Sequence, residues 1–85
     1  MTTNNEQLIL TEPVVFIYPN PTAATIYIEK VTTSELNYEI YSPTGKQLLQ
    51  GVLMDQIASI DLQELPQGIY FLRINNENYR ILKIE

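Results

Sequence analysis

Short runs of alternating apolar and polar residues fill the chain from Pro13 onward, and turn residues interrupt them at short intervals. This pattern is typical of an all-β sandwich or barrel, and not of strands that alternate with helices. No sustained helical stripe of apolar residues occurs, and β-branched and aromatic residues dominate the periodic stretches, so almost no helix is predicted. The seven expected strands are Val14–Tyr18, Thr25–Lys30, Asn37–Ser42, Lys46–Val52, Ile57–Leu62, Ile69–Ile74 and Tyr79–Ile84.

The period of two within each strand separates inward from outward side chains. Tyr27, Glu29, Glu39 and Tyr41 are expected to face outward. In the closing strand two assignments stay open, because Tyr79, Ile81 and Lys83 share one side while Arg80, Leu82 and Ile84 share the other. The expected inward set is Ile26, Ile28, Tyr38, Ile40, Ile60, Leu62, Tyr70, Leu72 and Ile74.

Turn chemistry separates the strands. Pro19 and Pro21 end the first strand, since neither residue has a backbone N–H to donate to a ladder. Ser42-Pro43-Thr44-Gly45 suits a type I turn with a left-handed glycine, and Leu65-Pro66-Gln67-Gly68 repeats that chemistry. Asn75-Asn76-Glu77-Asn78 predicts a further hairpin, because asparagine tolerates positive φ. Gly51, inside the fourth strand, indicates a bulge or a close backbone contact.

Composition narrows the class of protein. The 85 residues favour one small domain, with residues 14–85 as the sandwich and residues 1–13 as a flexible polar leader or linker. A formal charge of −5 and five scattered basic residues argue against a nucleic-acid partner. The sequence contains neither a secretory signal nor a run long enough to span a bilayer. Two interpretations stay open, an intracellular protein or a piece of a larger secreted chain.

Nothing in the sequence points to catalysis. The chain has no cysteine and no histidine, so the thiolate, the commonest metal ligand and the commonest general base at neutral pH are all missing. Asp61 is the one carboxylate considered for a catalytic role, and its place beside a turn favours bonds to nearby backbone donors instead. We expect no catalytic, cofactor-binding or metal-binding residue, and no enzyme.

Four blocks of residues, in a fixed order, carry a family resemblance. They are Tyr18-Pro19-Asn20-Pro21-Thr22 with Ile26 and Ile28, then Tyr38-Glu39-Ile40-Tyr41 with Gly45-Lys46, then Ile60-Asp61-Leu62 with Leu65 and Gly68-Ile69-Tyr70, and finally Arg80-Ile81-Leu82-Lys83. Over roughly residues 14 to 85 the chain resembles the type A C-terminal sorting domain of the type IX, or Por, secretion system of Bacteroidota. The resemblance implies an immunoglobulin-like, seven-stranded antiparallel β-sandwich at the end of a larger exported protein.

The resemblance also implies roles for single residues. Pro19, Asn20 and Pro21 match the opening motif, and Arg80 and Lys83 match basic positions of the closing strand; these five are the candidate recognition residues. Gly45, Asp61, Leu65, Gly68 and Tyr70 match structural positions of the family. Ser42 departs from the Asp or Asn that is more usual before the central turn, and Glu85 departs from a basic or short tail.

The implied function is a non-catalytic sorting signal without a cofactor. It would direct an upstream cargo in the same chain through the secretion translocon, by way of the periplasm and outer membrane, to the cell surface or the medium. A sortase-type protease would then remove the domain by cleavage within or upstream of residues 1–13. If the closing strand lies at a sheet edge, its unpaired backbone groups are a template for strand addition.

Two alternatives from other classes remain. One is an accessory carbohydrate-binding or adhesion module of a surface protein, in which Tyr27 and Tyr41 form an exposed aromatic patch. The other is a structural spacer between domains. For Pro19-Asn20-Pro21 itself, the simpler interpretation is a strand terminator that starts a turn.

Overall fold

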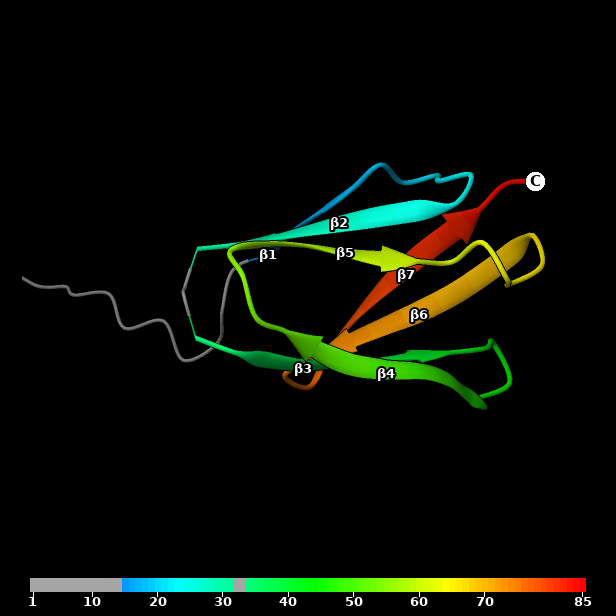
Figure 1. Ribbon diagram of the computed structural model, residues 1–85. Coiled ribbons are helices and arrows are strands. Elements are labelled where there is room, and N and C mark those ends of the chain that lie inside the picture. The colour runs from blue at the N-terminus through cyan, green and yellow to red at the C-terminus, as the bar shows by residue number, and fades with distance from the viewer. Residues whose placement is uncertain (1–14, 32–33) are drawn as a thin grey trace, which may run out of the picture.

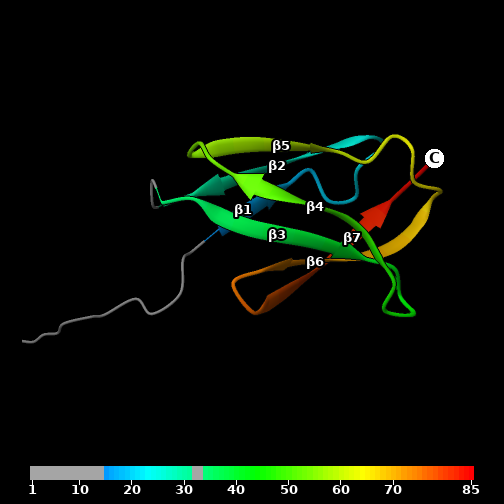
Figure 2. The ribbon, with the colours of Figure 1, turned by 60° about the horizontal axis from the view of Figure 1, so that its bottom comes forward.

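Two layers of antiparallel strands face each other in the computed structural model, which describes residues 15–31 and 34–85 (Figures 1 and 2). One layer is a three-stranded sheet in the order β1 (Val15–Tyr18), β2 (Thr25–Lys30) and β5 (Ile57–Asp61). The other is a four-stranded sheet in the order β4 (Gln47–Leu53), β3 (Leu36–Tyr41), β6 (Gly68–Ile74) and β7 (Glu77–Lys83). The predicted leader, residues 1–13, lies outside the described residues.

The predicted strands are all present, and the described residues contain no helix. The largest shift is in β7, which begins at Glu77 and not at Tyr79. Asn75 and Asn76 alone form the turn before it, with φ of 53° and 71°, and Ile74 pairs with Glu77. The expected four-residue turn was therefore too long, because two residues with positive φ already give a turn that matches the twist of the strands.

The inner faces of both sheets form one apolar core. The predicted inward residues are buried, except for Tyr38, which is half-buried and packs against the core. The closing strand is also settled, since Ile81 is fully buried while Arg80 and Leu82 are exposed. The buried apolar set is Ile26, Ile28, Ile40, Leu53, Ile60, Leu62, Tyr70, Leu72, Ile74 and Ile81.

Tyr70, near the start of β6, identifies the type of sandwich. Its ring is 6% exposed and its hydroxyl donates to the carbonyl oxygen of Pro66, four residues upstream at the β5–β6 corner. A tyrosine that bonds back to the backbone at this corner is a hallmark of immunoglobulin-like sandwiches. With the order of strands in the two sheets, it confirms the predicted fold class.

Gly45 and Gly68 have φ of +94° and +151°, a region that side-chain-bearing residues rarely adopt. The predicted Ser42–Gly45 turn is present, since the N–H of Gly45 donates to the carbonyl oxygen of Ser42 at 2.9 Å. The predicted Leu65–Gly68 turn is wrong, because the turn before β6 spans Leu62–Leu65 and Gly68 is already the first residue of β6. Gly51 lies directly opposite Tyr38, and a Cβ atom there would come within 2.7 Å of the tyrosine ring. The close contact expected at Gly51 is thus present, while the irregularity of the β3–β4 ladder falls between Ile40 and Tyr41.

The core also buries a lysine. The alternation of β2 predicts that it points inward, although it was not among the residues expected in the core. Lys30 follows Ile26 and Ile28 on the same face of β2 and is 2% exposed. Its Nζ donates to the carbonyl oxygens of Ser34 and Leu53, both at 2.7 Å. Because Leu53 belongs to β4, this side chain joins the two sheets.

Candidate functional site

The opening motif lies against the closing strand, although the two are far apart in the sequence. Asn20 Nδ2 donates to the carbonyl oxygen of Arg80 at 2.8 Å, and the backbone N–H of Leu82 donates to Asn20 Oδ1 at 3.0 Å. The amide side chain therefore offers β7 one donor and one acceptor, as a neighbouring strand would. Tyr18-Pro19 and Asn20-Pro21 are both cis peptide bonds.

Thr22 continues this contact along β7. Its N–H donates to the carbonyl oxygen of Leu82 at 2.9 Å, and the N–H of Ile84 donates to the carbonyl oxygen of Thr22 at 2.8 Å, which makes a parallel bridge between Thr22 and Lys83. Thr22 is 2% exposed and its Oγ1 donates to the carbonyl oxygen of Thr25 at 2.6 Å. Figure 1 shows the end of β7 close to the connection between β1 and β2.

These hydrogen bonds determine which backbone groups remain unpaired at the β7 edge of the four-stranded sheet. β7 is an edge strand, as strand addition requires. However, residues 20–22 already bond the backbone groups that point outward from this edge. These groups are the carbonyls of Arg80 and Leu82 and the N–H groups of Leu82 and Ile84. The expectation of unpaired backbone groups is wrong for this part of β7, because the opening motif covers the edge.

Asn20→Ala is expected to lower the free energy of unfolding by about 1–2 kcal/mol, since two hydrogen bonds of ~1 kcal/mol each are lost at an exposed position. The backbone N–H of Leu82 loses its acceptor, so its hydrogen exchange should become faster. Hydrogen exchange followed by NMR, together with urea unfolding, measures both effects. Asn37→Ala, at an exposed asparagine of β3, is the matched control. Unchanged protection of Leu82 would contradict the role given to Asn20.

The two basic candidates of the closing strand lie on opposite faces. Arg80 is exposed on the outer face of the four-stranded sheet. Lys83 is only 4% exposed, and its Nζ donates to the carbonyl oxygen of Glu85 at 3.1 Å. The structure thus brings Pro19, Asn20 and Pro21, all exposed, next to the backbone of Arg80, and turns the Lys83 side chain inward. Because successive side chains of a strand point to opposite faces, the sequence alone predicts that residues 80 and 83 face opposite sides of the sheet.

The remaining motif residues have internal contacts. Asp61 Oδ1 accepts the backbone N–H of Gln63 at 2.9 Å, which is the local bond that the sequence suggested. Leu65 packs against the core, and its N–H donates to the carbonyl oxygen of Leu62 at 2.9 Å. Both residues shape the β5–β6 connection.

The tyrosines considered for sugar binding do not form one patch. Tyr27 is on β2 of the three-stranded sheet and Tyr41 is on β3 of the four-stranded sheet, so their outer faces point away from each other. Tyr27 stacks instead on Tyr18, with ring centroids 5.9 Å apart. Partial desolvation, and then the Glu29 carboxylate 3.4 Å from the Tyr18 hydroxyl, raise the pKa of Tyr18 above its ordinary value. The expected Tyr27–Tyr41 patch is therefore wrong.

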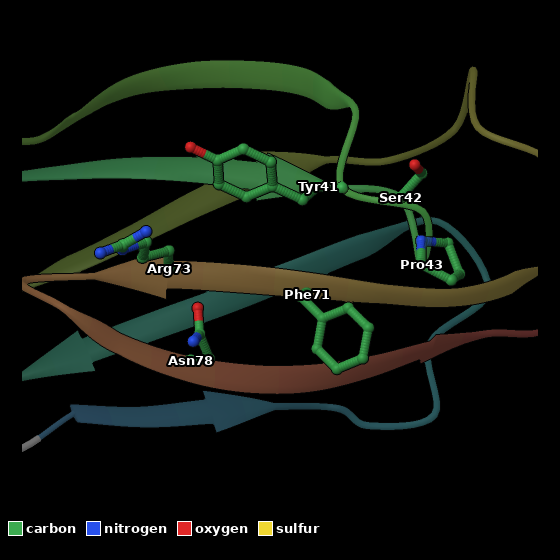
Figure 3. A pocket seen from close by; sticks show the side chains of 7 residues that line it. Tyr41, Ser42, Pro43, Phe71, Arg73 and Asn78 are labelled. Carbon is green, nitrogen blue, oxygen red and sulfur yellow. The ribbon is translucent and has the colours of Figure 1, made fainter.

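A shallow hollow lies on the outer face of the four-stranded sheet, beside the β3–β4 hairpin. Figure 3 shows the Tyr41, Phe71, Arg73 and Asn78 side chains on this face, with Ser42 and Pro43 at one end. Its volume is about 430 Å³. The sequence analysis missed Phe71 and Arg73, although they alternate with the inward residues Tyr70, Leu72 and Ile74.

Residues 15–31 and 34–85 hold no group of three or more acidic residues placed to bind a metal ion. Over the same ranges, no helix has the length and apolar character needed to cross a membrane.

Comparison with known families decides the identity of the chain. Residues 16–84 match the model of the secretion system C-terminal sorting domain. The chain belongs to this family. No protein with a curated description matches it. The family's members are the sorting signals of type IX secretion, so the resemblance noted in the sequence is confirmed over nearly the whole chain.

Family membership defines the function at the level of the domain. The sorting domain marks a secreted or cell-surface cargo for type IX secretion, and domains of this family are in general non-catalytic. The comparison supports this function and not the carbohydrate-binding alternative. It does not assign roles to single residues.

Proposed function

We propose that the export machinery reads one composite site on the sorting domain, made of the loop Pro19, Asn20 and Pro21 and the adjoining segment of β7 with Arg80. The supporting observation is the pair of hydrogen bonds from the Asn20 amide to the backbone of Arg80 and Leu82, which joins the two motifs. Lys83 is assigned a structural role in this proposal, because its side chain is buried.

Each part of the site has a separate task. Asn20 holds the loop on the edge of β7, so that the exposed rings of Pro19 and Pro21 have a fixed position. The Arg80 guanidinium, exposed on the outer face, supplies charge and up to five donors for a partner. A partner that adds a strand at this edge must first displace residues 20–22, whereas a partner that contacts the loop and Arg80 does not. The second route needs no rearrangement and is the one we propose.

The remaining steps concern the cargo. The cargo precedes the domain in the same chain, crosses the periplasm and reaches the outer-membrane translocon. A sortase-type protease then cleaves within or upstream of residues 1–13 and releases the cargo from the domain. This part of the proposal is supported by family membership alone.

A secretion assay tests the proposal. Residues 1–85 are fused behind a signal peptide and a fluorescent protein in a bacterium with a type IX system, and a translocon-deficient strain is compared with the parent. We expect fluorescence at the cell surface or in the medium of the parent only, and an immunoblot of the exported cargo should show that residues 14–85 are gone. Retention of the folded fusion in the periplasm of the parent would overturn the sorting function.

Arg80→Ala tests the composite site in the same assay. Export should fall by roughly tenfold, the effect of losing one charge-assisted contact of about 1.4 kcal/mol or more. Lys46→Ala removes an exposed cation from the β3–β4 hairpin and is the control. If both variants are exported like the parent domain, Arg80 is not part of the recognition site.

A further inference from the structure

The outer face of the four-stranded sheet contains a group of side chains that the sorting motif does not explain. The docking face is defined here as Tyr41, Phe71, Arg73, Asn78 and Arg80. Across the strands, Phe71 pairs with both Tyr41 and Arg80, and Arg73 pairs with Asn78. Residues paired in this way point to the same side of a sheet, and Phe71 and Arg73 alternate with the buried Tyr70, Leu72 and Ile74. The five side chains therefore lie on one face of the sheet, and four of them, Tyr41, Phe71, Arg73 and Asn78, line the hollow (Figure 3).

This face concentrates the exposed positive charge of an acidic protein. The chain carries a net charge of −5 and has five basic residues. Lys30 and Lys83 are buried, which leaves Lys46, Arg73 and Arg80 exposed, and both arginines are on the docking face. A surface of this kind is complementary to an anionic partner.

The two guanidinium groups remain available for such a partner. Arg73 Nη2 donates to Asn76 Oδ1 at 3.2 Å, which is a neutral contact. Within the described part of the chain, neither arginine forms an ion pair. Glu39 lies opposite Arg73 on β3, and its carboxylate accepts the Tyr41 hydroxyl at 3.4 Å.

The spacing of the arginines favours an extended peptide. Arg73 faces Asn78, so Arg80 is its diagonal neighbour on β7, and diagonal neighbours in an antiparallel pair are roughly 7–8 Å apart. Alternate residues of an extended strand are about 6.6 Å apart, since each residue advances ~3.3 Å. Carboxylates on alternate residues of such a peptide therefore reach both arginines. Phe71 and Tyr41 supply half-buried aromatic surface next to them.

We propose that the docking face binds an extended acidic segment of a partner protein that carries carboxylates on alternate residues. The proposal rests on the proposed function, because it names the chemistry by which a component of the export machinery holds the sorting domain. It differs from that function in one respect: binding of an acidic peptide is measurable on the domain alone.

The binding test uses the chain of residues 1–85 and a short capped peptide of alternating threonine and glutamate, followed by NMR titration. We expect chemical-shift changes centred on Tyr41, Phe71, Arg73, Asn78 and Arg80. A peptide with glutamine in place of glutamate is the control for charge, and a peptide with its glutamates in one block is the control for spacing. A short polyglucuronate represents an acidic sugar chain.

Arg73→Gln/Arg80→Gln should weaken peptide binding by roughly tenfold or more, since two charge-assisted contacts are lost. Gln56→Glu/Gln63→Glu, at exposed positions flanking β5 of the other sheet, lowers the net charge by the same two units and should leave binding unchanged. Thermal unfolding verifies that both double variants remain folded, as their exposed positions predict.

Four results would overturn the proposal: equal binding of the glutamine peptide, equal binding of the block peptide, equal loss in both double variants, or binding of polyglucuronate alone. The secretion assay separates the two proposals. If the parent fusion is not exported, the sorting function fails whatever the peptide does. If it is exported and Arg73→Gln/Arg80→Gln is exported equally well, only the role of the docking face is overturned.

Discussion

Leu72→Ala is expected to lower the free energy of unfolding by ~2–5 kcal/mol, through lost apolar transfer energy and the cavity left behind. Leu72 is fully buried in β6, the strand that pairs with both β3 and β7, and lies opposite Ile40 in the core. Because strands pair with β6 on both sides, little collapse around the cavity is expected. A loss of this size is a large part of the ~5–15 kcal/mol that stabilises a typical domain.

Urea unfolding followed by tyrosine fluorescence measures the loss as a lower midpoint. Leu82→Ala is the matched control, because it is the same substitution on the neighbouring strand, at a side chain that is 39% exposed on the outer face. It should cost far less, since the side chain is already partly in water. An unmoved midpoint for Leu72→Ala, or equal losses in the two variants, would show that the core is assigned wrongly.

Lys30→Ala is expected to lower the free energy of unfolding by about 2–4 kcal/mol. The substitution removes a buried aliphatic stem and leaves the carbonyl oxygens of Ser34 and Leu53 without their lysine donor. These carbonyls belong to the β2–β3 connection and to β4, so the substitution weakens the contact between the two sheets. Urea unfolding and hydrogen exchange near Leu53 measure it.

Two further variants separate the causes. Lys46→Ala, at an exposed lysine, should change the midpoint little and controls for loss of charge. Lys30→Met keeps most of the buried volume but has no donor, so it isolates the hydrogen bonds and should cost ~1–3 kcal/mol. If Lys30→Met is as stable as the parent domain, the two carbonyl contacts contribute no net stability and packing alone explains the alanine result.

The sequence left two alternative interpretations of the Pro19-Asn20-Pro21 motif, a strand terminator and a recognition site, and in the structure the two are compatible. Pro19 and Pro21 end β1, as a strand terminator should, and Asn20 between them occupies the edge of β7. A covered edge protects a small sandwich from unwanted strand pairing. The same contact fixes the motif at one place on the surface, which is what a recognition signal requires. A structural role for the motif thus supports the recognition role proposed for it.

The sequence by itself determined the strands, most of their faces and the turn glycine Gly45. Alternation with a period of two is a local property, and the backbone conformation of Gly45 is set by the Ser42–Gly45 turn in which it lies. The same alternation predicts that Lys30 points inward and that Arg80 and Lys83 lie on opposite faces. The family resemblance had instead grouped Arg80 and Lys83 together as basic recognition residues.

Only the tertiary structure decided which separated segments meet. Asn20 and Arg80 are 60 residues apart, and no local pattern states that the first connection of one sheet covers the edge of the last strand of the other. Likewise, alternation marks Tyr27 and Tyr41 as outward but does not assign them to different sheets. The physical reason is that the pairing of strands depends on contacts between distant residues, whereas facing and turns depend on neighbours along the chain.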